Sequence, residues 1–373
     1  MANILIMTRT HDVHSVYVSV GLEQLGHRAL RWFSADFPVQ DSLTATVSNV
    51  DDFAWRLEPP AGAVEGPFDT VWNRRRAPSA FPADRLPDSF HADDLAFVQQ
   101  ECGRMVSSIW YSIEPDAFWV NPIEHATRAA NKLLQLRVAK EIGLAIPKTC
   151  ASNNPDDIRM FLASAGSSGA IYKPFLQGHW DLDDGGHASL STKAVTLDQL
   201  PSDEVLRLTP GIFQTQIPKA YEVRATFMGR HCAAVAIDSQ SDARTQQDWR
   251  VVNPNELKMQ VIRLPDDVYE KSIDLMRRLG LVFGCFDFIV TPNGDYVFLE
   301  VNEMGQFTWV ELSLPELKLV DMMCCFLASS NPDFLYDYPS NPISIADILS
   351  SERFKTLWAE RHEAHVADAD KAP

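Results

Sequence analysis

Residues 286–302 read FDFIVTPNGDYVFLEVN, in which two runs rich in Phe, Ile, Val and Leu flank a Pro-Asn-Gly turn signal. This pattern predicts a β-hairpin. With Asn293 and Gly294 as a two-residue turn, the expected pairs are Val290 with Val297, Phe288 with Leu299, and Asp287 with Glu300. Two acids directly opposite one another destabilise a sheet, and unpaired carboxylates in apolar surroundings cost still more. The sequence therefore calls for a cation between Asp287 and Glu300.

A divalent cation held by the hairpin explains this arrangement. Mg²⁺ takes oxygen ligands, usually one or two carboxylates, and completes its shell with substrate phosphates. Glu300 and Asn302 are two positions apart on one strand and share a face, while Asp287 lies across the ladder on that face. We therefore expect Asp287, Glu300 and Asn302 to hold the metal. An edge hairpin with solvent-facing acids is the alternative, but large apolar residues on both faces favour a central strand.

A metal that binds phosphates implies cationic side chains close by. Lys173 lies in the apolar run IYKPF, where a lysine is costly unless it meets an anion. Lys132 lies in a long helical segment, and in a second predicted hairpin Glu222 and Arg224 share a face. Arg224 can hold a phosphate through two parallel hydrogen bonds. Each residue alone fits a surface salt bridge, but together with the hairpin acids they indicate a phosphate site.

Composition limits the class of protein. The chain has 373 residues, 46% of them hydrophobic, which is enough for two or three domains with sizeable cores. Because no apolar run fits a signal peptide or a membrane span, we expect a cytoplasmic protein with no membrane partner. A net charge of −17 argues against nucleic acid as a partner. The six cysteines lack metal-site spacing, which indicates free and mainly buried thiols.

The chain changes character along its length. Its first part alternates short apolar strands with helices, the βαβ pattern of an α/β domain. A long helix is then predicted from Pro122 to Gly143, followed by mixed strands, helices and the two hairpins. Near the end, an apolar stripe that includes Phe354 and Leu357 is expected to dock on the body. The expected units are 1–120, 121–210, 211–345, and a C-terminal helix and tail at 346–373.

The order of these motifs resembles the ATP-grasp fold, of the α/β (α+β) class, with an N-terminal Rossmann-like pre-ATP-grasp domain. The stretches VWNRRRAP, FWVNPIEHATRAANKLLQLRVAKEIGLAIPKT, FQTQIPKAYEVR, DWR and EVNEMGQFTWVE are similar to those of microviridin-type ATP-grasp peptide ligases, the graspetide synthetases. These enzymes use ATP to activate Asp or Glu side chains of a ribosomally made precursor peptide. Ser, Thr or Lys side chains of the same peptide then attack, which gives ester or amide cross-links.

The resemblance implies a nucleotide site. Lys132 and Lys173 would hold the α- and β-phosphates of ATP, and the chain around Gln214, Gln216 and Ile217 would meet adenine. The hairpin acids and Asn302 would carry Mg²⁺, expected as two ions. The partner implied is a precursor peptide with a leader and an acidic, hydroxyl-rich core, and the related ligases suggest a homodimer.

The resemblance also implies catalytic residues. Arg224 and Arg250 would steady the γ-phosphate and the acyl phosphate, with Glu222 beside them as the acid of the acid-x-Arg strand. The general base for the incoming hydroxyl stays open between Glu222, Glu303 and Glu311.

Two charged segments and two other functions are left open by the sequence. The run Arg74–Arg76 is either solvated or forms a wall that meets acidic substrate residues. The loop acids Asp181, Asp183 and Asp184 either face a basic part of the precursor or bind nothing. His179 and His187 in the same loop are expected to be solvated rather than catalytic. A carboxylate–amine ligase for a small molecule or a protein terminus is one alternative function. A non-catalytic, nucleotide-gated peptide-binding protein is the other.

Overall fold

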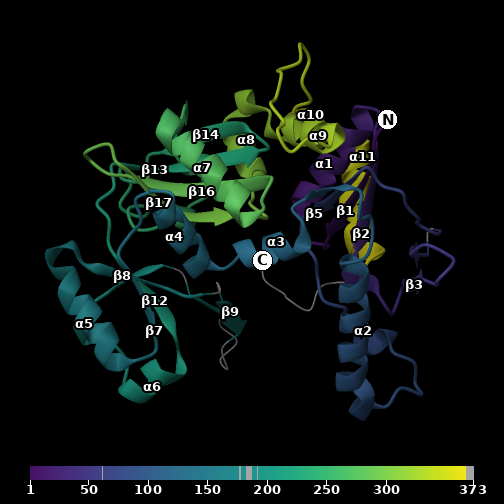
Figure 1. Ribbon diagram of the computed structural model, residues 1–373, viewed down its shortest axis with the longest axis horizontal. Coiled ribbons are helices and arrows are strands. Elements are labelled where there is room, and N and C mark those ends of the chain that lie inside the picture. The colour runs from purple at the N-terminus through teal and green to yellow at the C-terminus, as the bar shows by residue number, and fades with distance from the viewer. Residues whose placement is uncertain (61, 176–177, 182–186, 191, 367–373) are drawn as a thin grey trace.

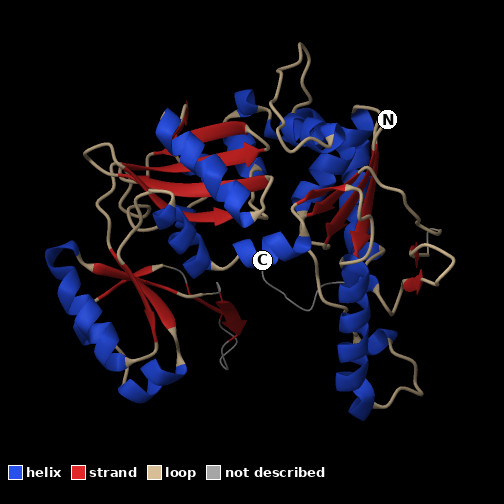
Figure 2. Cartoon of the chain, viewed as in Figure 1, coloured by secondary structure: helices blue, strands red, loops and turns tan. Residues whose placement is uncertain are grey.

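Three sheets organise the chain in the computed structural model (Figures 1 and 2). The structure describes residues 1–373 except 61, 176–177, 182–186, 191 and 367–373. For residues 178–181, 187–190 and 361–363 it describes the backbone only. Within the described ranges no helix is long and apolar enough to cross a membrane.

The N-terminal sheet is parallel, as the βαβ pattern predicts. Its strands follow the order β2-β1-β5-β6: Arg28–Phe33, Asn3–Thr8, Thr70–Asn73 and Phe118–Val120. Helix α1 (Val13–Gln24) follows β1, and the long helix α2 (Leu95–Trp110) precedes β6. A short hairpin of β3 (Ser42–Thr46) and β4 (Ala54–Glu58), which the sequence reading did not predict, lies beside this sheet.

The central lobe is an antiparallel sheet covered by α5 (Pro155–Ala165) and α6 (Asp203–Leu208). Its strand order is β11-β8-β12-β7: Lys193–Val195, Ala170–Lys173, Gly211–Thr215 and Thr149–Ser152. Because β12 lies in the middle of this sheet, the central lobe runs past the expected boundary at residue 210. The pair β9 (Gly178–Asp181) and β10 (His187–Leu190) extends from the same lobe.

The helix predicted from Pro122 to Gly143 is in fact two helices, α3 (Ile123–Ala129) and α4 (Lys132–Glu141). The break occurs at Asn131, whose side chain accepts a hydrogen bond from the backbone N–H of Leu134. Asparagine is among the best N-cap residues, so it starts a new helix where the apolar periodicity alone suggests continuity. As a result Lys132 is the first residue of α4.

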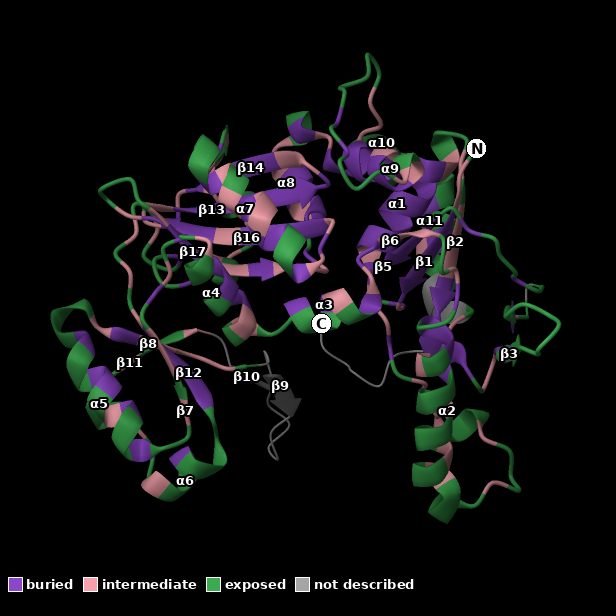
Figure 3. Ribbon diagram, viewed as in Figure 1, coloured by how far each residue is buried: buried purple, intermediate pink, exposed green. Residues whose placement is uncertain are grey.

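The C-terminal lobe is a five-stranded antiparallel sheet of order β15-β14-β13-β16-β17. The strands are Met259–Ile262, His231–Ile237, Tyr221–Met228, Phe283–Val290 and Tyr296–Asn302. Helices α4 and α7 (Asp266–Leu279) pack on one face of this sheet. The hairpin β16–β17 is therefore part of a buried sheet, as its apolar composition predicts (Figure 3).

The register of this hairpin differs from the prediction next to the turn and agrees with it at the acids. Val290 pairs with Tyr296 rather than Val297, because the turn is one residue longer than expected. The same shift makes Phe288 face Phe298 instead of Leu299, and a bulge then leaves Leu299 unpaired. The bulge restores the pairing of Asp287 with Glu300. The longer turn and the bulge shift the register in opposite directions, so the predicted pairing is correct at the two acids.

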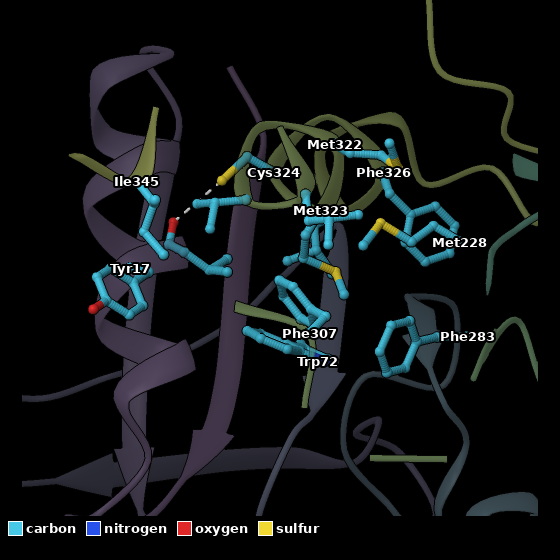
Figure 4. Close-up of a cluster of buried hydrophobic side chains, with 14 of the residues drawn as sticks. Tyr17, Trp72, Met228, Phe283, Phe307, Met322, Met323, Cys324, Phe326 and Ile345 are labelled. Atoms are coloured by element: carbon cyan, nitrogen blue, oxygen red, sulfur yellow. Dashed lines mark hydrogen bonds between the residues drawn. The ribbon is translucent and has the colours of Figure 1, made fainter. Parts of the chain in front are cut away.

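One large core joins the N-terminal domain to the C-terminal lobe (Figure 4). Trp72 of β5 and Phe283 of β16 belong to the same cluster as Met322 and Phe326 of α9 (Leu319–Ser329). Between the hairpin and α9 lies the short helix α8 (Thr308–Ser313). The shared core fixes the position of the hairpin relative to the N-terminal sheet.

The C-terminal helices α10 (Ile345–Ser350) and α11 (Glu352–Glu363) lie against α1 (Figure 1). Phe354 stacks on Tyr17 with ring centroids 5.0 Å apart, and Leu357 is buried beside it. The predicted docking of the apolar stripe is confirmed. Beyond α11, Val366 is buried against Ala77 and Ala80 of the N-terminal domain.

Candidate active site

Two cavities meet at the hairpin. The larger, about 940 Å³, lies between the N-terminal domain and the C-terminal lobe. The smaller, about 80 Å³, lies between the central and C-terminal lobes. Three residues line both of them: Trp249, Arg250 and Asp287. A group bound in one cavity is thus adjacent to a group bound in the other.

The two hairpin acids lie opposite one another, but a protein cation already faces one of them. Arg224 on β13 pairs with Asp287 on β16, and its Nη1 lies 2.9 Å from both carboxylate oxygens. Asn302 donates to Oδ2 of Asp287 at 3.0 Å. The expectation that the sheet needs a bound metal to tolerate the acids is therefore wrong. The hairpin sequence does not reveal this cation, because Arg224 lies on another strand, β13.

Glu300 is the acid that lacks such a partner. It is half-buried, and its side chain makes no hydrogen bond or salt bridge with the residues that the structure describes. Burial raises the pKa of Asp287, the charge of Arg224 opposes this rise, and the charge of Glu300 adds to it. Two carboxylates and an amide on one face fit Mg²⁺, which accepts few protein ligands. Within the described ranges no group of three or more His, Cys, Asp or Glu suits a metal, so other oxygens must complete the shell.

The two predicted lysines lie close together at the edge of this set. Lys173 lines the small cavity, and burial lowers its pKa, while the charge of Glu300 raises it and that of Lys132 lowers it. Lys132 lines neither cavity, and its Nζ donates to the backbone oxygen of Pro174 at 3.3 Å. From the first turn of α4, Lys132 adds a positive charge at a helix end that favours anions.

The predicted adenine segment lines the small cavity with Gln214, Gln216 and Ile217. The backbone N–H of Gln216 is bound to the oxygen of Gly169 at 3.0 Å. Gln214 is buried and donates to Thr149 Oγ1 at 3.0 Å, while its Oε1 has no hydrogen-bond partner in the described part of the chain. A buried acceptor without a partner is rare and marks a place for a ligand donor.

Arg250 lines both cavities. Its Nε and Nη2 bind the two oxygens of Asp248 at 2.8 and 2.9 Å. This parallel pair fixes the plane of the guanidinium and directs it toward the shared wall. A role for Asp248 was not predicted from the sequence. The signal for it is an acid two positions before the arginine in DWR.

Comparisons with known proteins agree with this fold. Residues 3–127 match the family model described as the MvdD pre-ATP grasp domain. No curated protein matches the chain in sequence. An ATP-grasp ligase from Chryseobacterium gregarium, described as RiPP-associated and solved with ADP and a leader and core peptide, is 26% identical with a TM-score of 0.80. That match covers 89% of this chain and 98% of the other.

A second solved structure is the macrocyclase MdnC of Microcystis aeruginosa MRC, bound with the precursor peptide MdnA. It is 29% identical with a TM-score of 0.76, over 88% of this chain and 100% of its own. The macrocyclase MdnB of the same organism is 28% identical with a TM-score of 0.71, over 88% and 99%. The chain is an ATP-grasp ligase. The resemblance to the microviridin-type ligases and the ATP-grasp fold with a pre-ATP-grasp domain are confirmed.

The acids considered as general base occupy three different environments in the ligase. Glu222 lines the small cavity and accepts from Lys219 Nζ at 2.8 Å, while burial raises its pKa and the charge of Lys219 opposes this. Glu303 lines the large cavity, and burial raises its pKa. Glu311 lines neither cavity and is fully buried.

Glu311 has a structural role instead. Its oxygens accept the backbone N–H groups of Val320 at 2.7 Å and Ile345 at 3.1 Å. These bonds cap the start of α9 and α10, so Glu311 as a general base is wrong.

The arginine run of the ligase divides into a structural part and a half-buried part that lines the large cavity. Arg74 is fully buried, pairs with Asp12 at 3.2 Å and donates to the backbone oxygen of Met304 after the hairpin. Arg75 and Arg76 line the large cavity. The solvated alternative is therefore wrong for Arg74, while the other two belong to the wall of the cavity.

Several residues that position the site were missed by the sequence reading. The side chain of Asn121 donates to the backbone oxygens of Phe283 and Glu303 at 2.9 and 3.0 Å. The buried His14 accepts from the backbone N–H of Phe307 at 3.1 Å. Both tie the N-terminal domain to the hairpin, and only the tertiary fold reveals these contacts. Asp183 and Asp184 lie outside the described residues, and for Asp181, His179 and His187 only the backbone is described.

Proposed function

We propose that the ligase activates Asp or Glu side chains of a ribosomally made precursor peptide as acyl phosphates and joins them to Ser, Thr or Lys side chains of that peptide. The observation that carries this proposal is the shared wall of Trp249, Arg250 and Asp287. A phosphate donor on one side and a peptide carboxylate on the other would meet there without leaving their own cavities.

ATP fits the small cavity by the chemistry of its lining. The orphan Oε1 of Gln214 can accept from the exocyclic amine of adenine, and Lys173 offers a positive charge at the phosphate end. Lys132, at the start of α4, adds a second charge beside Lys173. The cavity must widen for a nucleotide, which is consistent with closure of lobes around ATP during turnover.

Asp287, Glu300 and Asn302 would hold magnesium, which neutralises charge on the transferring phosphoryl group when bound. The binding of two ions and the homodimer expected from the resemblance stay predictions. Arg250, fixed by Asp248, stands where the γ-phosphate and the acyl phosphate would lie. Such preorganised charge, rather than covalent participation, is what phosphoryl transfer requires.

The reaction balances in two steps. A peptide carboxylate oxygen attacks the γ-phosphorus and ADP leaves; a Ser or Thr oxygen or a Lys nitrogen then attacks the acyl carbon and phosphate leaves. Glu303 is placed to take the proton of the incoming group, because it alone among the three acids lines the large cavity. Burial raises the pKa of Glu303, which makes it a stronger base than an exposed glutamate.

The relatives with 26% and 29% identity were solved with a leader and core peptide and with a precursor peptide. This supports a precursor with a leader and an acidic, hydroxyl-rich core as the substrate here. The large cavity also favours such a substrate, since it is lined by arginines from both domains. A small-molecule carboxylate–amine ligase remains the alternative to be tested against it.

The decisive experiment measures ADP release with a synthetic precursor peptide encoded beside the gene, and with free amino acids. We expect ADP release with the peptide and not with free amino acids. Mass spectrometry should show the loss of one water per cross-link. Turnover with free amino acids and none with the peptide would replace the proposal by the small-molecule reaction. Nucleotide binding without any turnover would favour the non-catalytic peptide-binding alternative.

A further inference from the structure

The wall of the large cavity that faces away from the nucleotide has cationic groups without anions. Arg75 and Arg76 line it, and neither makes an ion pair with a carboxylate in the described part of the chain. By contrast, Arg224 and Arg250 on the opposite wall are paired with Asp287 and Asp248. The burial of unpaired charge is costly, so the Arg75–Arg76 wall is built for a ligand that brings negative charge.

Arg76 is held in a defined position on this wall. Its Nε donates to Asn73 Oδ1 at 2.9 Å, and its guanidinium lies over the ring of Trp110 at 4.7 Å from the centroid. The remaining guanidinium nitrogens make no hydrogen bond with the described residues and are left for another acceptor. Burial lowers the pKa of Arg75 to about 10, with the charge of Arg74 adding to the effect and that of Asp12 opposing it. An anion between these side chains would offset that burial.

Two residues of this wall carry buried neutral donors without a partner. Trp110 is 9% exposed and lines the cavity, yet its Nε1–H has no hydrogen-bond partner in the described ranges. The buried Oγ of Ser79 on the same cavity also has none there. Buried indole N–H groups usually find a partner. The indole, a hydroxyl and a planar guanidinium together are the donor set that suits a carboxylate.

We propose that Arg75, Arg76, Trp110 and Ser79 form a subsite for a second carboxylate of the peptide, an Asp or Glu side chain that is bound but does not react. The inference rests on the proposed function and adds a substrate preference to it: the enzyme selects peptides that carry a second acid. A substrate held at both ends, by a reacting acid near Asp287 and a recognised acid on the Arg75–Arg76 wall, would be oriented as well as bound. A peptide with a single acid would lose the second contact.

The subsite can be tested by binding, without catalysis. The probe is a fluorescein-labelled tetraglutamate peptide, compared with the matched tetraglutamine peptide, in the presence of ADP and Mg²⁺ and read by anisotropy. The variants are Trp110→Phe, which keeps the ring and removes the N–H, and Arg76→Gln. The control is Arg104→Gln, which makes the same charge change on the exposed face of α2 and lines neither cavity.

We expect the full-length protein to prefer tetraglutamate over tetraglutamine. Each subsite variant should weaken tetraglutamate binding by about 10-fold, because each loses a hydrogen bond to a charged group. Arg104→Gln should leave it unchanged. Equal affinity for the two peptides, or equal loss in the control, would overturn the subsite. Because ADP release with the precursor is measured separately, failure of the proposed function and failure of the subsite give different results.

Discussion

Arg224 and Asp287 lie directly opposite each other on neighbouring strands, and one guanidinium nitrogen lies 2.9 Å from both oxygens of the carboxylate. The same arginine donates from Nη2 to the backbone oxygen of Gln306 at 2.9 Å. Both side chains are largely buried. Arg224 therefore stabilises the fold at the hairpin as well as standing beside the predicted chemistry, and mutations at Arg224 and Asp287 will combine both effects.

Replacing Arg224 with Met should destabilise the protein strongly. The change leaves Asp287 buried and opposite Glu300 without its cation, and breaking a buried pair by removal of one partner costs about 3–5 kcal/mol. Urea unfolding followed by circular dichroism measures this. Arg224→Met/Asp287→Asn should recover part of the loss, since no unpaired charge then remains. A stability equal to that of the wild type in the single variant would contradict the pairing.

Glu300→Gln should separate activity from stability. Glu300 has no hydrogen bond or salt bridge among the described residues and faces Asp287, so its removal relieves repulsion and should leave the unfolding free energy equal or higher. ADP release should fall by about 100-fold or more if the carboxylate holds magnesium, and raised Mg²⁺ should restore part of it. Asp267→Asn, on the exposed side of α7, is the control. Unchanged turnover in Glu300→Gln would remove Glu300 from the metal site.

Asp248→Asn should impair turnover with little effect on folding. The carboxylate fixes Arg250 by two hydrogen bonds, and the amide retains only one acceptor for them. A less well oriented guanidinium should lower kcat by about 10-fold while KM for ATP changes less, because the charge is still present. Steady-state ADP release against ATP concentration checks this. The opposite pattern, a changed KM with normal kcat, would place Arg250 in ground-state binding instead.

The stability of the N-terminal domain should depend on pH through Asp41. Burial raises the pKa of Asp41 to about 6, the charge of Asp36 adds to this, and that of His365 opposes it. Asp41 Oδ1 is buried without a partner in the described chain. A raised folded pKa stabilises the fold below the unfolded pKa of about 4, and the contribution is lost as pH rises through about 6.

Asp41→Asn should therefore melt higher than the wild type at about pH 8, and the difference should vanish at about pH 4. Differential scanning fluorimetry across this range measures it. Asp51→Asn, on an exposed loop of the same domain, should show no such trend. A constant difference at every pH would mean that packing rather than protonation distinguishes the variant.

The sequence was sufficient to predict the structure where the signal was local. The alternation of apolar residues and the Asn-Gly turn placed Asp287 across from Glu300, although the actual turn is longer and a bulge at Leu299 compensates for it. The order of motifs gave the ATP-grasp architecture. Errors arose where a single polar residue outweighed periodicity, as at Asn131, whose side chain caps a second helix inside an apparently continuous one.

What the sequence did not provide are contacts between segments far apart in the chain. The pairing of Arg224 with Asp287 requires a third strand that the hairpin pattern does not contain. Asn121 reaches the start of β16 and the end of β17 from another domain. Trp110 looks like an ordinary core residue of α2, but it lines a cavity and its buried N–H has no hydrogen-bond partner in the described ranges. Such features depend on the packing of domains, which short-range patterns do not encode.

The wall common to both cavities has a consequence for inhibitor design. Since Trp249, Arg250 and Asp287 border both spaces, the two cavities are separated there by single side chains. A single bisubstrate compound, with an adenosine moiety linked through a phosphonate to an acidic dipeptide, could therefore span them. The linker length that binds best would indicate the distance between the two bound groups. The compound's affinity would exceed that of either half, because the two halves bind as one molecule.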